Sequence, residues 1–295
     1  MQASLLYKSG NILAEGPFWH AARQSFFWVD IDGKKLHEYE WNGGKTREWQ
    51  LDYRVSLIVE PINDDHLILG VQGGLATFDL QTGKFEWLLD IEKEIPMNRT
   101  NDGGCDPAGR LWIGTMHRQF EKGSGSLYSV EPDLSVKKRL GNVTVSNGIV
   151  WSQDGKRIYF IDSPTQTVQS FLFDTETGDL QFEKIAISIN KKTGTPDGAC
   201  MDEEGMLWIA QWDGFGVYRW NPLTGMMLDK IDLPVPQVSS CAFGGENMDH
   251  LLITTARENM SDDNLKQYPL SGNVFIAKPG VKGMTVHKFG KQEVK

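Results

Sequence analysis

The sequence predicts an all-β fold, a six-bladed β-propeller with four antiparallel strands in each blade. Short runs rich in β-branched and aromatic residues alternate with Gly, Asp, Asn and Pro turns along all 295 residues. One template also repeats about every 40–50 residues, which is the length of a four-stranded propeller blade. Six such repeats use the whole chain, so we expect one domain spanning residues 1–295.

The template is a turn ending in glycine, followed by a strand with an aromatic residue between apolar ones. In the first two predicted blades, strands at 26–30 and 36–39 flank a turn, and strands at 67–70 and 75–78 precede a closing turn. The full template is found at 106–115, 152–162 and 202–210, with a weaker copy at 251–255. A β-helix or solenoid would need shorter or helical repeats, and a two-sheet sandwich would not explain a repeated template.

The first strand of each predicted blade should line the central channel. These strands are expected near residues 16–19, 55–60, 101–105, 147–151, 197–201 and 239–243. The first blade already contains four strands, which leaves residues 5–7 unassigned. We expect either this segment or the C-terminal run at 285–289 to complete the last blade and cover its edge. The recurring tryptophans Trp28, Trp112, Trp151 and Trp208 should be core residues.

Composition excludes several classes of partner. The net charge is −9 and no basic run occurs, so nucleic acid is not expected to bind. No stretch reaches the roughly 20 apolar residues of a membrane helix, and residues 1–10 lack the apolar region of a signal peptide. Three cysteines form no disulfide framework and are expected in the core. We therefore expect a cytoplasmic protein without nucleic-acid or membrane partners. The oligomeric state is left open.

Four acid or amide residues precede a glycine at the start of predicted inner strands. They are Glu15, Asn101, Asn147 and Asp197. Asn101 is separated from its glycine by Asp102. If the repeats close into a ring, these residues converge at one end of the channel. Carboxylate and amide oxygens suit hard divalent cations such as Ca²⁺, Mg²⁺ or Mn²⁺, with Fe²⁺ and Zn²⁺ as further candidates. The alternative interpretation is that these pairs are only hairpin-turn residues.

Five motifs together resemble the SMP-30/gluconolactonase/regucalcin family. Their order and spacing match over nearly the whole chain, and the set is specific although no single member is. They are Glu15-Gly16-Pro17-x-Trp19, Arg99-x-Asn101-Asp102-Gly103, Gly114-Thr115-Met116, Ser146-Asn147-Gly148 and Pro196-Asp197-Gly198. The resemblance implies a six-bladed β-propeller that hydrolyses sugar lactones with one divalent cation. It implies that Glu15, Asn147 and Asp197 bind this metal and that Asp197 is also the catalytic acid/base.

The resemblance also implies that Arg99 and Asn101 contact the substrate. Many relatives carry a Glu shortly after the Gly-Thr-Met motif, where it contacts the sugar. Gln119 falls at that place by spacing, and Glu121 is a shifted candidate. This departure leaves the sugar preference open. For Arg99, an ion pair with Asp102 across the channel is the structural alternative.

Taken with this resemblance, the chain is expected to be a metal-dependent lactonase that converts a sugar lactone, such as gluconolactone, to the open-chain acid. A cation can polarise the lactone carbonyl, and a carboxylate can move the proton between water and the leaving oxygen. The alternative from another class is a non-enzymatic divalent-cation (calcium) binding regulatory protein that uses the same site. An interaction propeller is disfavoured because the repeats lack Trp-Asp and kelch signatures. A lactonase or esterase for apolar substrates is the remaining alternative.

Overall fold

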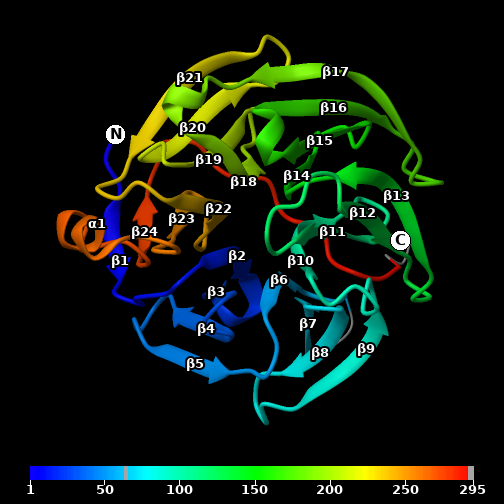
Figure 1. Ribbon diagram of the computed structural model, residues 1–295, viewed down its shortest axis with the longest axis horizontal. Helices are drawn as coiled ribbons and strands as arrows, with labels where there is room; N and C mark the ends of the chain where they lie inside the picture. Colours follow the sequence, from blue (N-terminus) through cyan, green and yellow to red (C-terminus); the bar gives the residue numbers. More distant parts are fainter. Residues whose placement is uncertain (63–65, 292–295) are drawn as a thin grey trace.

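Six four-stranded antiparallel sheets surround a central axis in the computed structural model (Figure 1). The structure describes residues 1–62 and 66–291. The innermost strands β2, β6, β10, β14, β18 and β22 contact one another in sequence, and β22 contacts β2 to close the ring. The predicted β-propeller, its number of blades and the predicted channel-lining strands are therefore confirmed.

The first three blades follow chain order from the channel outward. Blade 1 consists of β2 (Ala14–His20), β3 (Ser25–Asp30), β4 (Lys35–Glu40) and β5 (Thr46–Gln50). Blade 2 consists of β6 (Val55–Val59), β7 (His66–Val71), β8 (Gly74–Asp79) and β9 (Phe85–Asp90). Blade 3 consists of β10 (Asn98–Cys105), β11 (Leu111–His117), β12 (Gly125–Val130) and β13 (Val136–Val143).

Blades 4 and 5 repeat this order, and blade 6 departs from it. Blade 4 consists of β14 (Ser146–Trp151), β15 (Arg157–Asp162), β16 (Thr167–Phe173) and β17 (Leu180–Ser188). Blade 5 consists of β18 (Thr195–Met201), β19 (Leu207–Trp212), β20 (Gly216–Asn221) and β21 (Met226–Asp232). Blade 6 contains β22 (Val238–Gly244), β23 (His250–Thr255) and β24 (Val274–Ala277), with β1 (Ser4–Tyr7) as its fourth strand.

Within residues 1–62 and 66–291, helices are few and short. One α-helix, α1 (Asp262–Gln267), and three 3₁₀ turns, η1 (Ala21–Arg23), η2 (Ser163–Thr165) and η3 (Lys191–Thr193), lie in connections between strands. None of the helices in the described part of the chain has the length and apolar character needed to span a bilayer.

The last blade is completed by the N-terminal segment. Strand β1 pairs antiparallel with β24, with Ser4 opposite Ile276 and Leu5 opposite Phe275. This confirms one of the two predicted closures, in which the first strand of the chain joins the last blade. The other candidate, the run at 285–289, does not join a blade. It crosses the ring as part of a C-terminal segment (Figure 1).

This C-terminal segment, residues 281–290, ties together blades on opposite sides of the ring. The amide of Met284 donates to the carbonyl of Met201 in blade 5 (3.1 Å), and the amide of Phe289 donates to Glu60 next to blade 2 (3.0 Å). The amide of Gly290 then reaches Gly109 in blade 3 (3.0 Å). Residues 284–287 cover a cavity of about 170 Å³ that all six inner strands line. The segment therefore closes one end of the channel.

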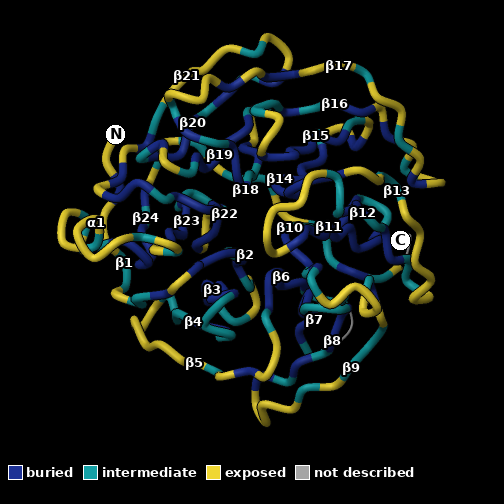
Figure 2. The backbone as a smooth tube through the Cα atoms, in the orientation of Figure 1, coloured by how far each residue is buried: buried dark blue, intermediate teal, exposed yellow. Residues whose placement is uncertain are grey.

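Burial decreases from the axis outward. The inner and second strands are mostly buried, whereas β5, β13, β17 and β21 are largely exposed and β9 is mostly half-buried (Figure 2). The four template tryptophans are buried, as predicted, and lie in hydrophobic clusters between neighbouring sheets. Two cysteines are buried and Cys200 is half-buried, with its sulfur 3.7 Å from that of Cys241 and no disulfide.

A buried aspartate explains why the template combines a glycine turn with a tryptophan. In blade 3, Asp106 accepts from the backbone amides of Ala108 (2.9 Å) and Arg110 (3.0 Å), which closes the turn. Its second oxygen accepts from the indole of Trp112 (2.9 Å) and from Nε of Arg110 (2.6 Å). In blade 5, Asp202 accepts from the indole of Trp208 at the same distance of 2.9 Å. The turn and the core tryptophan are therefore one hydrogen-bonded unit.

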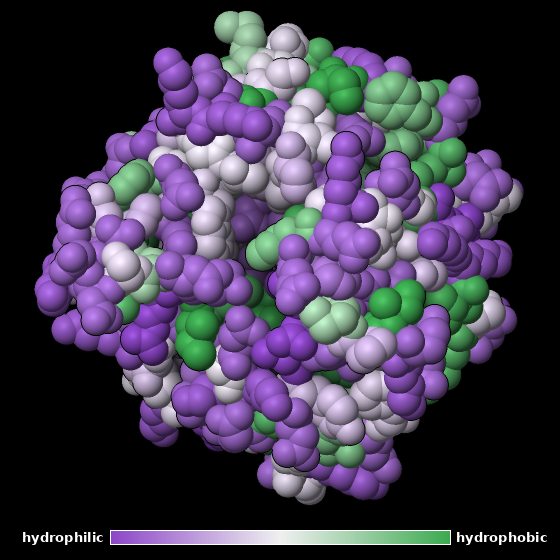
Figure 3. Space-filling model, in the orientation of Figure 1, coloured by the Kyte–Doolittle hydropathy of each residue, from purple (hydrophilic) through white to green (hydrophobic). Residues whose placement is uncertain are grey.

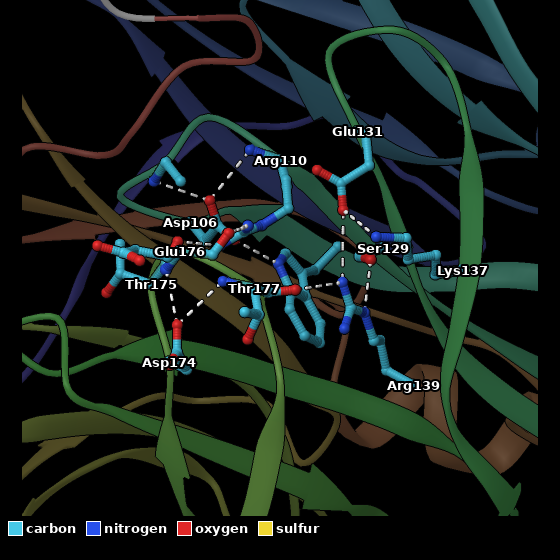
Figure 4. Close-up of polar contacts among 12 residues, drawn as sticks. Asp106, Arg110, Ser129, Glu131, Lys137, Arg139, Asp174, Thr175, Glu176 and Thr177 are labelled. Carbon is cyan, nitrogen blue, oxygen red and sulfur yellow. Dashed lines mark hydrogen bonds and ion pairs between the residues drawn. The ribbon is translucent and has the colours of Figure 1, made fainter. Parts of the chain in front are cut away.

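Two arginines of blade 3 hold the closing turn of blade 4 (Figure 4). Arg110 donates to the backbone carbonyls of Thr175 (2.6 Å) and Glu176 (3.0 Å), and Arg139 donates to the carbonyl of Thr177 (3.0 Å). Carbonyls in a turn have no strand partner, and a guanidinium can satisfy several of them at once. These contacts fix the angle between two neighbouring blades.

Candidate metal and substrate site

Each site residue lies near the start of an inner strand, at a β-bulge. The pairing register shifts in β2 after Glu15, in β10 after Thr100, in β14 after Asn147 and in β18 after Pro196. A bulge turns side chains away from the regular alternation of a strand. None of the four acid-glycine or amide-glycine pairs lies in a hairpin turn, so the turn interpretation of these pairs is wrong.

The glycines in these pairs allow the inner strands to approach closely. A β-carbon on Gly148 would lie 3.0 Å from the carbonyl oxygen of Asp197 and 2.6 Å from the side chain of Ile161. A β-carbon on Gly198 would lie 2.1 Å from the hydroxyl of Ser240. A larger residue at either position would push neighbouring blades apart. The pairs therefore combine a ligand-type side chain with the close packing that brings those side chains together.

Glu15 and Asp197 form a buried acidic pair. Burial raises the pKa of Glu15 from its usual 4.5 to about 8, and the nearby charge of Asp102 adds to the rise. Burial raises the pKa of Asp197 well above its usual range, and the charges of Glu15 and Asp102 raise it further. Removing two carboxylates from water next to each other is unfavourable unless a positive charge lies between them.

A hydrogen-bonded chain orients the amide of Asn147. Its Nδ2 donates to the hydroxyl of Ser163 (2.7 Å), and that hydroxyl donates to the carbonyl of Pro196 (2.7 Å). The amide oxygen of Asn147 is therefore directed to the other side, where Nδ2 of Asn101 donates to it (2.8 Å). A carbonyl oxygen has two acceptor sites, so one remains for a cation.

Arg99 is half-buried, and among residues 1–62 and 66–291 no carboxylate forms an ion pair with it. Its Nη1 donates to the carbonyl of Thr100 (3.0 Å) and to the side-chain oxygen of Asn101. Burial lowers the pKa of Arg99, while the charges of Asp32, Glu258 and Glu15 act in the opposite direction. Among the described residues it forms no ion pair with Asp102, which lines the cavity on the other side of the bulge. The ion-pair alternative for Arg99 is therefore wrong.

These residues share one pocket of about 600 Å³. Glu15, Arg99, Asn101, Asn147 and Asp197 all line it. In the space-filling view the molecule is hollowed close to the ring axis, with hydrophilic residues around the opening (Figure 3). Sites for small molecules commonly measure about 300–1,000 Å³ and combine a few polar groups with apolar walls. Here Leu13, Met116, Phe120, Val145, Pro164 and Trp212 provide the apolar part.

The loop after β11 presents an aromatic residue to this pocket. Phe120 lines it, whereas Gln119 is exposed and neither Gln119 nor Glu121 is among the lining residues. Phe120 has a left-handed backbone (φ 57°) and its amide donates to the carbonyl of His117 (2.8 Å). His117 is buried at the end of β11, where its Nδ1 accepts from the amide of Gln119 (3.3 Å). This tight turn directs Phe120 toward the channel.

The donor set fits one hard divalent cation. Two buried carboxylates and an oriented amide oxygen are the ligand types that such cations bind, and a cation would relieve the repulsion that raises both pKa values. Among the described residues no three His, Cys, Asp or Glu side chains are grouped to hold a metal. The candidate set differs from such a group because its third donor is an amide. Glu15, Asn147 and Asp197 would hold the ion.

The fold and the site define a β-propeller with a carboxylate and amide cluster at one end of its channel. Residues 13–257 match the model of the SMP-30/gluconolactonase/LRE-like region, so the chain belongs to this family. Regucalcin from Macaca fascicularis is 35% identical over 289 residues, covering 93% of this chain and 94% of that protein. This membership confirms the resemblance that the five motifs indicated.

Solved structures agree over nearly the full length. A calcium-binding protein, regucalcin, from Agrobacterium tumefaciens superposes with a TM-score of 0.93 at 30% identity, covering 98% of this chain and 97% of that one. A luciferin-regenerating enzyme superposes with a TM-score of 0.91 at 30% identity, covering 98% of this chain and 99% of that one.

Several pocket residues were not predicted from the sequence. Ser163, Gln166, Gln237 and Glu258 lie outside the five motifs and line the same pocket. Ser163 and Glu258 follow the second strands of their blades, β15 and β23. Each inner strand starts at the pocket, so the second strand returns to it, and the following loop lies at the pocket end. Polar residues in the loop after each second strand are therefore the signal in the sequence that would have identified Ser163 and Glu258.

Proposed function

We propose that this protein is a metal-dependent lactonase that hydrolyses sugar lactones, such as gluconolactone, to open-chain sugar acids. The observation that supports it most is that the buried Glu15–Asn147–Asp197 set shares a pocket large enough for a monosaccharide with Arg99. We further propose Ca²⁺, Zn²⁺, Mn²⁺, Mg²⁺ or Fe²⁺ as the bound ion, since the donors are all oxygens.

The residues divide the chemistry between them. A bound divalent cation supplies Lewis-acid polarisation of the lactone carbonyl. Arg99 donates hydrogen bonds to the substrate oxygens. Asn101 bonds to both Arg99 and the amide oxygen of Asn147, and so fixes the position of these two side chains relative to each other. Asp197 takes a proton from the attacking water and returns it to the ring oxygen that leaves. We keep Gln119 as a proposed substrate contact that requires its loop to move, because its side chain is exposed.

A screen of lactones against single cations tests this proposal. Protein treated with a chelator should hydrolyse gluconolactone only after a divalent ion is restored. Arg99→Ala should lower kcat/KM on the order of ten- to a hundredfold while the metal content stays normal, since a charged hydrogen bond contributes about 1.5–3 kcal/mol. Metal-independent turnover, or unchanged metal content in both Glu15→Ala and Asp197→Ala, would contradict the assignment.

The second candidate is a cation-binding protein without catalytic activity. It is favoured by the similarity to a solved protein described as a calcium-binding protein, regucalcin. The same screen separates the two functions. Tight binding of a divalent ion without turnover of any sugar lactone would support the regulatory function and contradict the enzymatic one.

A further inference from the structure

The pocket contains a third carboxylate that has no place in the proposed metal site. Among the described residues that line it, only Glu15, Asp197 and Glu258 carry carboxylates. Glu258 lies in blade 6, in the turn that follows β23, and is half-buried. The amide of Gln237, another lining residue, donates to the backbone carbonyl of Glu258 (3.0 Å). This bond ties the turn to the start of β22.

Asp32 and Arg99 are the charged neighbours of Glu258. Arg54 pairs with Asp32 (2.7 Å), and the side chain of Asp32 shares a hydrogen bond with that of Glu258. The charge of Glu258 acts on Glu15, Asp197 and Arg99, so it faces the same space as the metal set. No ion pair occupies the Glu258 carboxylate among the described residues. The contact with Asp32 engages one side of the carboxyl group, which leaves its other oxygen for a ligand.

We propose that Glu258 binds substrate by accepting hydrogen bonds from hydroxyl groups, and thereby selects polyhydroxylated lactones over unsubstituted ones. A carboxyl oxygen accepts hydrogen bonds from hydroxyl groups, and the oxygen of Glu258 that does not contact Asp32 can bind one. Arg99 supplies donors to the same pocket, so together the two side chains match hydroxyl groups, which both donate and accept. The inference rests on the proposed lactonase function and defines its substrate class.

Aromatic side chains of the same pocket suit the apolar face of such a molecule. Trp212 and Phe120 line the same pocket, and aromatic surfaces cover the C–H faces of a sugar ring. A lactone without hydroxyls would contact these rings but leave Glu258 and Arg99 desolvated and unpaired. A site built to hydrogen-bond hydroxyls discriminates strongly against ligands that lack them, because its buried polar groups then lose their partners.

Two substrates with the same ring test this inference. We expect Glu258→Ala to lower kcat/KM for glucono-δ-lactone on the order of ten- to a hundredfold, mainly through KM, because a lost hydrogen bond to a charged group has this effect. For δ-valerolactone, which has no hydroxyls, the change should stay within about threefold. Glu258→Gln should lose less, because its amide keeps one acceptor. An equal loss on both lactones, or no loss on the hydroxylated one, would overturn the inference.

Glu246→Gln is the matched control. Glu246 is exposed in the same blade, beyond the far end of β22, and the substitution removes the same charge. Its kinetics and metal content should match the wild type, and the metal content of the Glu258 variants should be normal.

A binding measurement separates this inference from the proposed function. If the wild-type protein hydrolyses neither lactone, the lactonase proposal fails. Calorimetry with D-gluconate, which carries the same hydroxyls, then still tests Glu258. Weaker binding to Glu258→Ala by roughly tenfold or more would support the inference, and equal binding to both proteins would overturn it.

Discussion

At the scale of single residues, the proposed function places opposite demands on Asp197. As a metal ligand it must be ionised, whereas as a general base it must accept a proton during the reaction. Burial and the charges of Glu15 and Asp102 raise its pKa, so without a cation it holds a proton tightly. A bound cation reverses this preference. The two roles therefore need separate measurements of metal occupancy and rate.

Asp197→Asn separates these roles. We predict that the variant keeps part of its metal affinity, because an amide oxygen can still ligate, but loses nearly all activity, because an amide cannot accept the proton. The measurement is the rate per bound metal at saturating cation. Asp229→Asn, at an exposed position on β21, is the control. A near-native rate per bound metal would show that Asp197 only holds the ion.

Glu15 makes the stability of chelator-treated protein depend on pH. Its pKa is raised from 4.5 to about 8, so between these values the folded state binds a proton that the unfolded state has released. Stability therefore falls as pH rises through this window. Glu15→Gln should make the decline shallower in urea unfolding from about pH 5 to about pH 8, and Glu246→Gln should not. The decline persists in part because Asp197 also has a raised pKa. Equal slopes in wild type and Glu15→Gln would contradict this prediction.

At the scale of elements, the repeated template predicted most of the fold. Alternating apolar residues and glycine turns located the inner strands, and the structure confirms all six. The pattern did not predict the course of residues 281–290, because this segment is held by only one or two backbone bonds to each of four blades and has no periodicity of its own. It also did not show which residue of 118–121 lines the pocket, since the direction of Phe120 depends on a left-handed backbone angle. Side chains in loops, such as Glu258, lie outside the repeated template, so the repeat could not predict that they line the pocket.

The buried aspartate of the template is the most sensitive point of a blade. Asp106→Asn keeps the size of the side chain but leaves Arg110, with which it pairs at 2.6 Å, as an uncompensated buried charge. We predict a loss of about 3–5 kcal/mol in the free energy of unfolding, measured by urea titration. Asp202→Asn should cost less in blade 5, because Arg219, which pairs with Asp202 (2.7 Å), also pairs with Glu204 (2.7 Å).

The equivalent turn of blade 4 provides the control. Asp154 is exposed and bonds only to Ser152 and to the amide of Lys156. Asp154→Asn should cost no more than about 1 kcal/mol. A cost for Asp106→Asn as small as that of the control would mean that the buried pair is not what holds the template together.

At the scale of the whole molecule, a propeller is stable only when its ring is closed, because every blade buries its faces against two neighbours. Here closure depends on residues from both ends of the sequence. Strand β1 supplies the outer strand of blade 6, and the amide of Ala3 also donates to the carbonyl of Asp232 in blade 5 (3.0 Å). The chain thus fastens its last blade with its first strand, next to the junction with blade 5.

Deletion of residues 1–8 should therefore weaken the molecule far more than the small size of β1 suggests. It would expose the backbone edge of β24 beside the buried residues Val274 and Phe275, which favours aggregation. We predict a lower Tm and concentration-dependent aggregation on heating. Leu5→Thr, which keeps the backbone pairing and changes a partly exposed side chain, should remain close to the wild type.

A peptide spanning residues 1–8 makes this prediction specific, because an added strand can pair with an open sheet edge. Supplied in excess to the truncated protein, it should raise the Tm and suppress aggregation in a concentration-dependent manner. The same peptide with proline at positions 5 and 7 should have no effect, since proline removes the amides that pair with β24. A truncated protein with unchanged Tm would show that the ring is closed by the contacts between inner strands alone.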